Sequence, residues 1–150
     1  SKINKKNFFF NKDDLDNFNS LEDKNDSRKS IQILNALSKY DNAQSIVCIN
    51  GYIIAIEAVE GTDSLLKRTI SLRKKLNQVK IKSGLLTKIP KKKQSKLVDL
   101  PVIGPKTIDL VYKANLNGIA INPKYTMVYN KDKVLKLAKL YKLKIYSIKK

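Results

Sequence analysis

Histidine is absent from this chain of 150 residues, and cysteine occurs once, as Cys48. A single thiol cannot form an internal disulfide. Without histidine the chain also cannot build a histidine-dependent catalytic triad or the common zinc sites of cysteine and histidine. Any metal ion bound here must therefore be held by oxygen ligands.

Long apolar runs are missing as well. No stretch approaches the roughly 18 residues that a membrane-spanning helix needs, and residues 1–11 lack the apolar core of a signal peptide. We therefore expect a cytoplasmic protein. Hydrophobic residues still make up 42% of the chain, which is enough for a packed core in one ordinary domain.

Acidic residues are scarce. The chain has 13 Asp and Glu and 31 Lys and Arg, which gives a formal net charge of +18. Such a balance favours an anionic partner. Only Arg28, Arg68 and Arg73 are arginines, although arginine recognises phosphates and bases best through its planar fork. A coding bias toward adenine and thymine would also enrich lysine, asparagine and isoleucine. Part of the charge is therefore explained equally well as a solvated background.

The first half of the chain predicts an arm, a helix and a hairpin. Residues 1–26 are mostly polar and indicate an irregular arm or interdomain linker. A helix is predicted over residues 27–40 from its apolar spacing, with Asp26 or Ser27 as the N-cap. Two β-branched runs separated by Asn50-Gly51 then predict a hairpin with a type I′ turn, because both turn residues must take positive φ.

Helices and strands alternate in the rest of the chain. This order predicts an α/β domain with a mixed β-sheet, an N-terminal β-hairpin and three to four flanking helices. The remaining helices are predicted near residues 63–76, 105–115 and 131–142, and the remaining strands over 84–89, 118–121, 126–129 and 143–148.

Two segments combine a glycine-containing turn, a carboxylate and an immediate helix start. One runs from Glu60 to Asp63, and the other from Asp99 to Thr107. A helix N-terminus attracts anions through its free N–H groups and its dipole. Carboxylates beside such an anion are tolerated when a hard cation lies between them. The pattern therefore points to phosphate chemistry with Mg²⁺ or Mn²⁺.

Each of these features also has a plainer structural interpretation. Thr62 or Asp63 can act only as a helix N-cap, and Asp99 can accept a hydrogen bond within an Asx turn. The lysines between positions 88 and 93 can form a solvated loop. Glu57 alternates with apolar neighbours on its strand and is expected to face solvent.

An ordered set of short motifs runs through the chain from about residue 27 to its end. They are Ala43-Gln44-Ser45, Asn50-Gly51, Ala55 to Asp63, Lys88, Pro90-Lys91, Gln94, Asp99 to Thr107, and Gly118 to Ile121. At these spacings the set resembles the C-terminal domain of the UDP-2,3-diacylglucosamine pyrophosphatases of the LpxI type.

The resemblance implies an enzyme of lipid A biosynthesis. It would cleave the pyrophosphate of UDP-2,3-diacylglucosamine to 2,3-diacylglucosamine 1-phosphate and UMP, using Mg²⁺ or in its place Mn²⁺. The full family chain begins with a Rossmann-like domain, so the resemblance implies that domain as a partner. Residues 27–150 would then be the catalytic domain, expected to be inactive or weakly active alone.

The matching positions also imply site residues. Catalytic roles fall to Asp99 and Asp63, and metal binding to Asp99, Glu60 and Asp63. Substrate binding is implied for Gly61, Thr62, Lys88, Lys91, Gln94 and Thr107, with Lys88, Lys91 and Gln94 on the phosphate or uridine side.

A small basic module that binds RNA or DNA without catalysis is the alternative. It would use the lysine faces of the helices at 63–76 and 131–142, with affinity falling steeply as salt rises. The scarcity of arginine and of aromatic-rich strands makes it the weaker hypothesis. The lysines would also suit peripheral contact with the anionic inner membrane, and a homodimer is left open.

Overall fold

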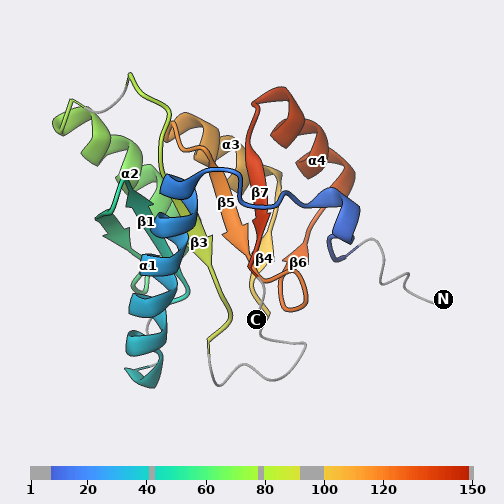
Figure 1. Cartoon of the computed structure of the whole chain (residues 1–150), viewed down its shortest axis with the longest axis horizontal. Coiled ribbons are helices and arrows are strands. Elements are labelled where there is room, and N and C mark those ends of the chain that lie inside the picture. The colour runs from blue at the N-terminus through green and yellow to red at the C-terminus, as the bar shows by residue number, and fades with distance from the viewer. Residues whose placement is uncertain (1–7, 41–42, 78–79, 92–99, 149–150) are drawn as a thin grey trace.

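The computed structural model describes residues 8–40, 43–77, 80–91 and 100–148. Its main sheet has five strands in the order β2-β1-β3-β5-β7, flanked by helices on both faces (Figure 1). This confirms the predicted α/β fold with an N-terminal hairpin. The strands are β1 (Ser45–Ile49), β2 (Tyr52–Ile56), β3 (Leu85–Lys88), β5 (Gly118–Ile121) and β7 (Lys144–Ser147), and the helices are α1 (Leu21–Leu37), α2 (Thr62–Lys75), α3 (Pro105–Lys113) and α4 (Lys131–Leu140).

Strand direction brings several chain segments to one edge of the sheet. β3, β5 and β7 are parallel, whereas β1 is antiparallel to both β2 and β3. The turn between β1 and β2 has positive φ at Asn50 (48°) and Gly51 (85°), as predicted for the hairpin. A second, small parallel pair consists of β4 (Val102–Ile103) and β6 (Met127–Val128). It follows that the carboxyl ends of the parallel strands and the start of β1 share one edge.

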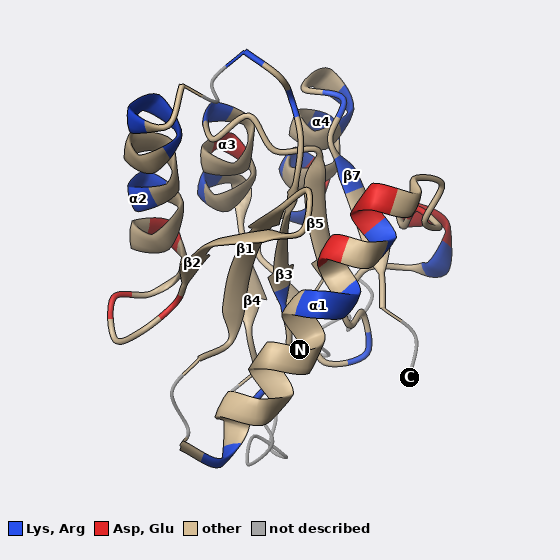
Figure 2. Cartoon of the chain, turned by 60° about the vertical axis from the view of Figure 1, so that its left-hand side comes forward, with Lys and Arg blue, Asp and Glu red and all other residues tan. Residues whose placement is uncertain are grey.

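Alternation along the strands divides the core between the two faces of the sheet. One face packs against α2, α3 and α4, which Figure 2 shows side by side, while α1 covers part of the other face. Strand residues of the first face include Val47, Ile49, Leu86, Ile119 and Ile145, and those of the second include Ile46, Cys48, Leu85, Ala120 and Tyr146. In the described residues, no helix is both long and apolar enough to cross a membrane.

The first helix begins earlier than predicted. α1 starts at Leu21, six residues before the predicted start, and its N-cap is Ser20, whose Oγ accepts a hydrogen bond from the N–H of Asp23 at 3.2 Å. The prediction of Asp26 or Ser27 as N-cap, with an irregular arm up to residue 26, is therefore wrong for residues 21–26. The polar sequence shows no sign of this turn of helix because Asp23 and Asp26, two of its acidic residues, are buried against distant hydrogen-bond partners.

Asp26 joins α1 to the hairpin turn. Its carboxylate is 1% exposed and accepts hydrogen bonds from the N–H groups of Gly51 at 2.7 Å and Asn50 at 3.0 Å. The thiol of Cys48 also donates to it at 3.4 Å. Burial and the neighbouring Asp26 carboxylate raise the pKa of Cys48 to about 12, so this thiol stays protonated. The carboxylate thus satisfies backbone donors that a tight turn would otherwise leave unpaired.

Arg73 makes a second buried junction, at the end of α2. Its side chain donates to the carbonyls of Ala114 and Asn115, each at 2.7 Å, and to the carbonyl of Ile81 at 2.8 Å. Burial lowers the pKa of Arg73. These bonds satisfy carbonyls at the C-terminal end of α3, where the helix dipole favours a cation.

Three helices end in a left-handed residue that is not glycine. α2, α3 and α4 are followed by Asn77, Asn115 and Lys142, whose φ values are 54°, 58° and 56°. Helices commonly end in this conformation, usually with glycine, and asparagine tolerates it better than most residues. The chain therefore terminates this whole helical layer without using any of its five glycines.

We predict that Asp26→Ala lowers the free energy of unfolding by about 3 kcal/mol, because it removes the buried charged acceptor of two backbone N–H groups in the hairpin turn. Asp26→Asn should lower it less, since one acceptor oxygen is kept. Urea unfolding followed by circular dichroism measures both. The exposed Asp13→Ala is the matched control, and equal stability of Asp13→Ala and Asp26→Ala would contradict the role of Asp26.

Candidate active site

A pocket of about 380 Å³ lies at the edge where the parallel strands end. It is formed by the turn between β2 and α2, the first turn of α2, the end of β3, β4 and the first turn of α3. Carboxyl ends of parallel strands are the usual place for ligands in α/β sheets. The lining residues are Glu57, Glu60, Gly61, Thr62, Asp63, Ser64, Lys88, Val102 and Thr107.

Lys88, the last residue of β3, places a buried ammonium group in this pocket. The residue is 7% exposed, and its Nζ donates to Thr62 Oγ1 at 3.0 Å and to the carbonyl of Val102 at 3.4 Å. Burial lowers the pKa of Lys88, and the carboxylates of Glu57 and Asp63 partly oppose this by favouring the charged form. A charge so placed is preorganised to meet an anion.

Glu57 is buried rather than solvent-facing, so that prediction is wrong. Its exposure is 8%, and its two carboxylate oxygens accept hydrogen bonds from Ser45 Oγ at 2.8 Å and Thr62 Oγ1 at 3.2 Å. β2 ends at Ile56, and the first turn of α2 then folds back over the following residue. The N–H of Glu57 still donates to the carbonyl of Ser45 at 2.9 Å, and two residues earlier Ala55 is also buried. The prediction failed because this side of the hairpin is covered and not open to solvent.

Ser45 is a second site residue that the sequence did not single out. It is fully buried at the start of β1, and its Oγ lies 3.1 Å from Thr62 Oγ1. Together Ser45, Thr62 and Lys88 form a continuous hydrogen-bonded chain that ends on Glu57. The signal that could have found Glu57 is a carboxylate inside an otherwise apolar strand sequence, because such a group needs a partner when buried.

The N-terminus of α2 opens onto the pocket without a side-chain cap. Gly61 is its N-cap residue, with φ 88°, a conformation that other residues adopt only under strain. Within the described parts of the chain, no side-chain cap accepts a hydrogen bond from the first N–H groups of this helix. These groups and the positive end of the dipole are therefore available to an anion.

The two predicted helix starts are joined by one hydrogen bond. Thr107, in the first turn of α3, donates to Asp63 Oδ1 at 3.1 Å. α3 also begins without a side-chain cap, at Gly104. The structure thus places Gly61, Thr62, Asp63, Lys88 and Thr107 in one pocket, and their roles stay predictions.

The other predicted site residues are not all found in the pocket. Glu60 lines the pocket, but its carboxylate forms an ion pair with Arg68, and this hydrogen bond lowers the pKa of Glu60. Lys91 is not among the lining residues. Gln94 and Asp99 lie outside the described residues. Acidic residues nevertheless occur together in the turn between β2 and α2 (Figure 2).

The described residues offer few carboxylates to a metal ion. Within the parts of the chain that the structure covers, no group of three or more His, Cys, Asp or Glu is arranged to hold one. Asp63 Oδ1 is bonded to Thr107, and no described residue is bonded to its Oδ2. Mg²⁺ is commonly held by one or two carboxylates together with substrate phosphates. Asp63 fits that mode of binding, and the metal stays a prediction.

The fold and this pocket define an α/β domain with a candidate phosphate site at the carboxyl edge of its sheet. A sequence model described as the LpxI C-terminal domain matches residues 16–146, and the chain belongs to this family. This confirms the predicted family.

A relative from Caulobacter vibrioides is named UDP-2,3-diacylglucosamine pyrophosphatase LpxI. It is 32% identical over 114 residues, which are 75% of this chain and 41% of the relative. The chain therefore spans less than half the length of that relative.

The lowered pKa of Lys88 predicts a specific pH dependence of stability. Between the lowered pKa in the folded chain and the ordinary value of 10.5, the unfolded chain holds a proton that the folded chain has lost. The free energy of unfolding should therefore rise with pH in this window through Lys88. Urea titrations from pH 7 to 10.5 should show the rise in the wild type and in the exposed control Lys67→Met, but not in Lys88→Met. Parallel curves for wild type and Lys88→Met would contradict the assignment.

Proposed function

We propose that this chain supplies the pyrophosphate-cleaving domain of a UDP-2,3-diacylglucosamine pyrophosphatase, which releases UMP and 2,3-diacylglucosamine 1-phosphate. The observation that carries the proposal is the buried Lys88 ammonium beside the uncapped N-terminus of α2. The family match and the name of the relative support the choice of substrate.

Lys88 and α2 would act on the charge of the pyrophosphate. As phosphorus is attacked, negative charge builds up on the bridging oxygen that leaves. Fixed N–H groups and a buried ammonium stabilise such charge more strongly than water does, because they need no reorganisation. Thr62 would hold the Lys88 ammonium in place through its hydroxyl, which in turn donates to Glu57.

Formal charges within the pocket argue for a divalent cation. Glu57 and Asp63 carry two negative charges against the one positive charge of Lys88, while Glu60 is already paired with Arg68. A pyrophosphate entering this pocket would therefore meet a net negative set of side chains. Mg²⁺, when bound by Asp63, would neutralise phosphate charge. We propose Asp99, carried over from the family resemblance, as a second carboxylate for metal binding or for activating water.

The lysine-rich outer surfaces of α2 and α4 give the alternative function its support. Figure 2 shows basic residues along both helices. Arg68 and Arg73, however, are engaged by Glu60 and by backbone carbonyls, so neither offers its guanidinium to a nucleic acid. These surfaces also suit contact with an anionic membrane, where a lipid-linked substrate is found.

We predict that UMP with Mg²⁺ shifts the amide resonances of Gly61, Asp63 and Thr107 in 150 mM NaCl. Lys88→Met should weaken this binding at least about 10-fold, since a charge-assisted contact to phosphate is lost, whereas Lys67→Met should leave it unchanged. EDTA should abolish the shifts. Binding of a short RNA alone, without a metal requirement and with steep salt dependence, would favour the nucleic-acid module instead.

Catalysis is tested by release of UMP from UDP-2,3-diacylglucosamine. We expect the 150-residue chain to turn over slowly or not at all, so the assay includes any longer natural form that contains it. In an active form, Asp99→Asn should lower kcat at least about 100-fold, as expected for loss of a general base or metal ligand, with an unchanged melting temperature. Retention of most activity would show that Asp99 is not the catalytic carboxylate.

A further inference from the structure

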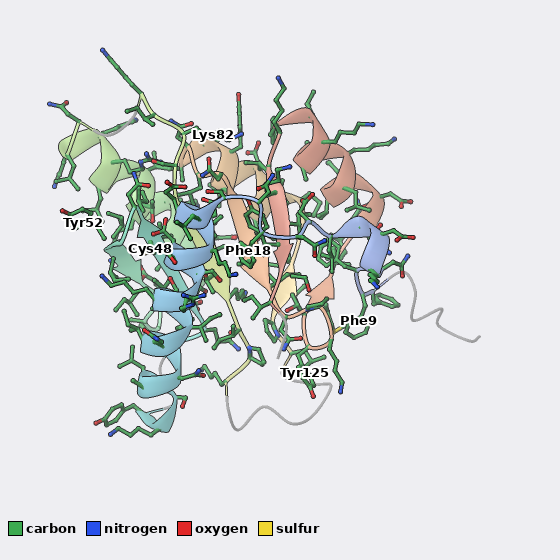
Figure 3. All side chains as sticks on the ribbon, viewed as in Figure 1. Phe9, Phe18, Cys48, Tyr52, Lys82 and Tyr125 are labelled. Atoms are coloured by element: carbon green, nitrogen blue, oxygen red, sulfur yellow. The ribbon has the colours of Figure 1, made fainter. Side chains whose placement is uncertain are left out.

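A second pocket, of about 510 Å³, lies on the opposite face of the main sheet. It is bounded by α1, by residues 17–18 and by the end of β7. Phe18 stacks on Tyr146, which belongs to the α1 side of the sheet, with ring centroids 4.3 Å apart (Figure 3). The lining residues are Asn17, Phe18, Lys24, Ser27, Arg28, Ile31, Gln32, Ser147 and Ile148.

The rim of this pocket carries uncompensated positive charge. Lys24 and Arg28 lie one helical turn apart on α1, and no Asp or Glu is among the lining residues. Arg68 pairs with Glu60, and Arg73 caps carbonyls. Among the described residues, Arg28 is thus the one arginine of the three without a hydrogen-bond or ion-pair partner. A guanidinium whose N–H groups are not engaged by the protein is suited to a bidentate contact with phosphate.

A buried hydroxyl points to the same kind of ligand. Ser27 lines the pocket and is 2% exposed, yet its Oγ has no hydrogen-bond partner among the described residues. Buried polar groups are nearly always paired, so an unpaired one next to a pocket needs an explanation. Ser27, Lys24 and Arg28 contribute three donor side chains, two of them cationic, which together suit the terminal oxygens and the charge of a phosphate monoester.

The rest of the lining is apolar and firmly held. Phe18 is fixed by its stack on Tyr146, and Ile31 and Ile148 complete the apolar wall. Ligand sites typically combine such walls with a few converging polar groups. The ligand therefore needs an apolar or aromatic portion as well as a phosphate.

We propose that the pocket between α1 and β7 binds an organic phosphate monoester, with its phosphate on Lys24, Arg28 and Ser27 and its apolar or planar portion against Phe18. The site is separate from the candidate active site and does not depend on the proposed hydrolase function. Because no carboxylate lines it, binding here requires no metal ion. A nucleotide and an alkyl phosphate share this chemistry, and the test distinguishes them.

The test titrates the whole chain with UMP, hexyl phosphate and inorganic phosphate, in EDTA and 150 mM NaCl, and follows the amide spectrum. EDTA removes metal-dependent binding at the candidate active site, so the two sites are separated. We expect UMP or hexyl phosphate to shift Phe18, Ser27 and Ile148, at least 10-fold more tightly than inorganic phosphate. Shifts with UMP alone identify a nucleotide site, and shifts with hexyl phosphate alone identify a site for alkyl phosphates.

Matched variants decide which residues are responsible. Arg28→Met should weaken binding at least 10-fold, while the exposed Lys67→Met should not. Ser27→Ala should weaken binding several-fold without lowering the stability of the free protein, because the hydroxyl it removes has no partner. The proposal is overturned if neither organic phosphate shifts these residues at millimolar concentration, or if Arg28→Met binds as tightly as the wild type.

Discussion

The burial of the Lys88 ammonium sets the main constraint on the site. An unpaired charge in a protein interior costs several kcal/mol, so a buried lysine needs acceptors and an opposing charge close by. Thr62 and the carbonyl of Val102 supply the acceptors, and Glu57 supplies the charge through the shared hydroxyl of Thr62. The end of β3, the start of α2 and β4 must therefore keep their relative positions for the charge to be tolerated.

The two pockets of this domain differ in the charges that surround their basic side chains. At the carboxyl edge of the sheet, the positive charge is matched by carboxylates, so a phosphate there would bring a cation with it. On the α1 face the positive charge has no carboxylate beside it. The sheet lies between the two pockets, and its alternating side chains give each face its own core.

Much of the fold could be predicted from sequence, and the failures have a common cause. Asn50-Gly51 predicts the hairpin because few other pairs accept positive φ at both positions, and the apolar spacing locates α2, α3 and α4. The start of α1 and the burial of Glu57 were missed because both depend on distant partners: Asp26 on the hairpin turn, and Glu57 on Ser45. Propensity and alternation describe neighbours along the chain and carry no information about such contacts. For the site, the glycine-containing helix starts predicted the two segments Glu60 to Asp63 and Asp99 to Thr107, and the family resemblance assigned roles to single residues within them.

The left-handed residues that end α2, α3 and α4 are of the types that the base composition of the gene would favour. Asparagine and lysine codons begin with two adenines, whereas glycine codons begin with two guanines. Asn77, Asn115 and Lys142 are thus residues that a bias toward adenine and thymine favours, at positions where helices commonly use glycine. A Cβ at Gly61 would meet no other atom within 4 Å, yet with φ 88° any other residue would be strained there. Backbone conformation, and not packing, is therefore what requires glycine at the opening of the pocket.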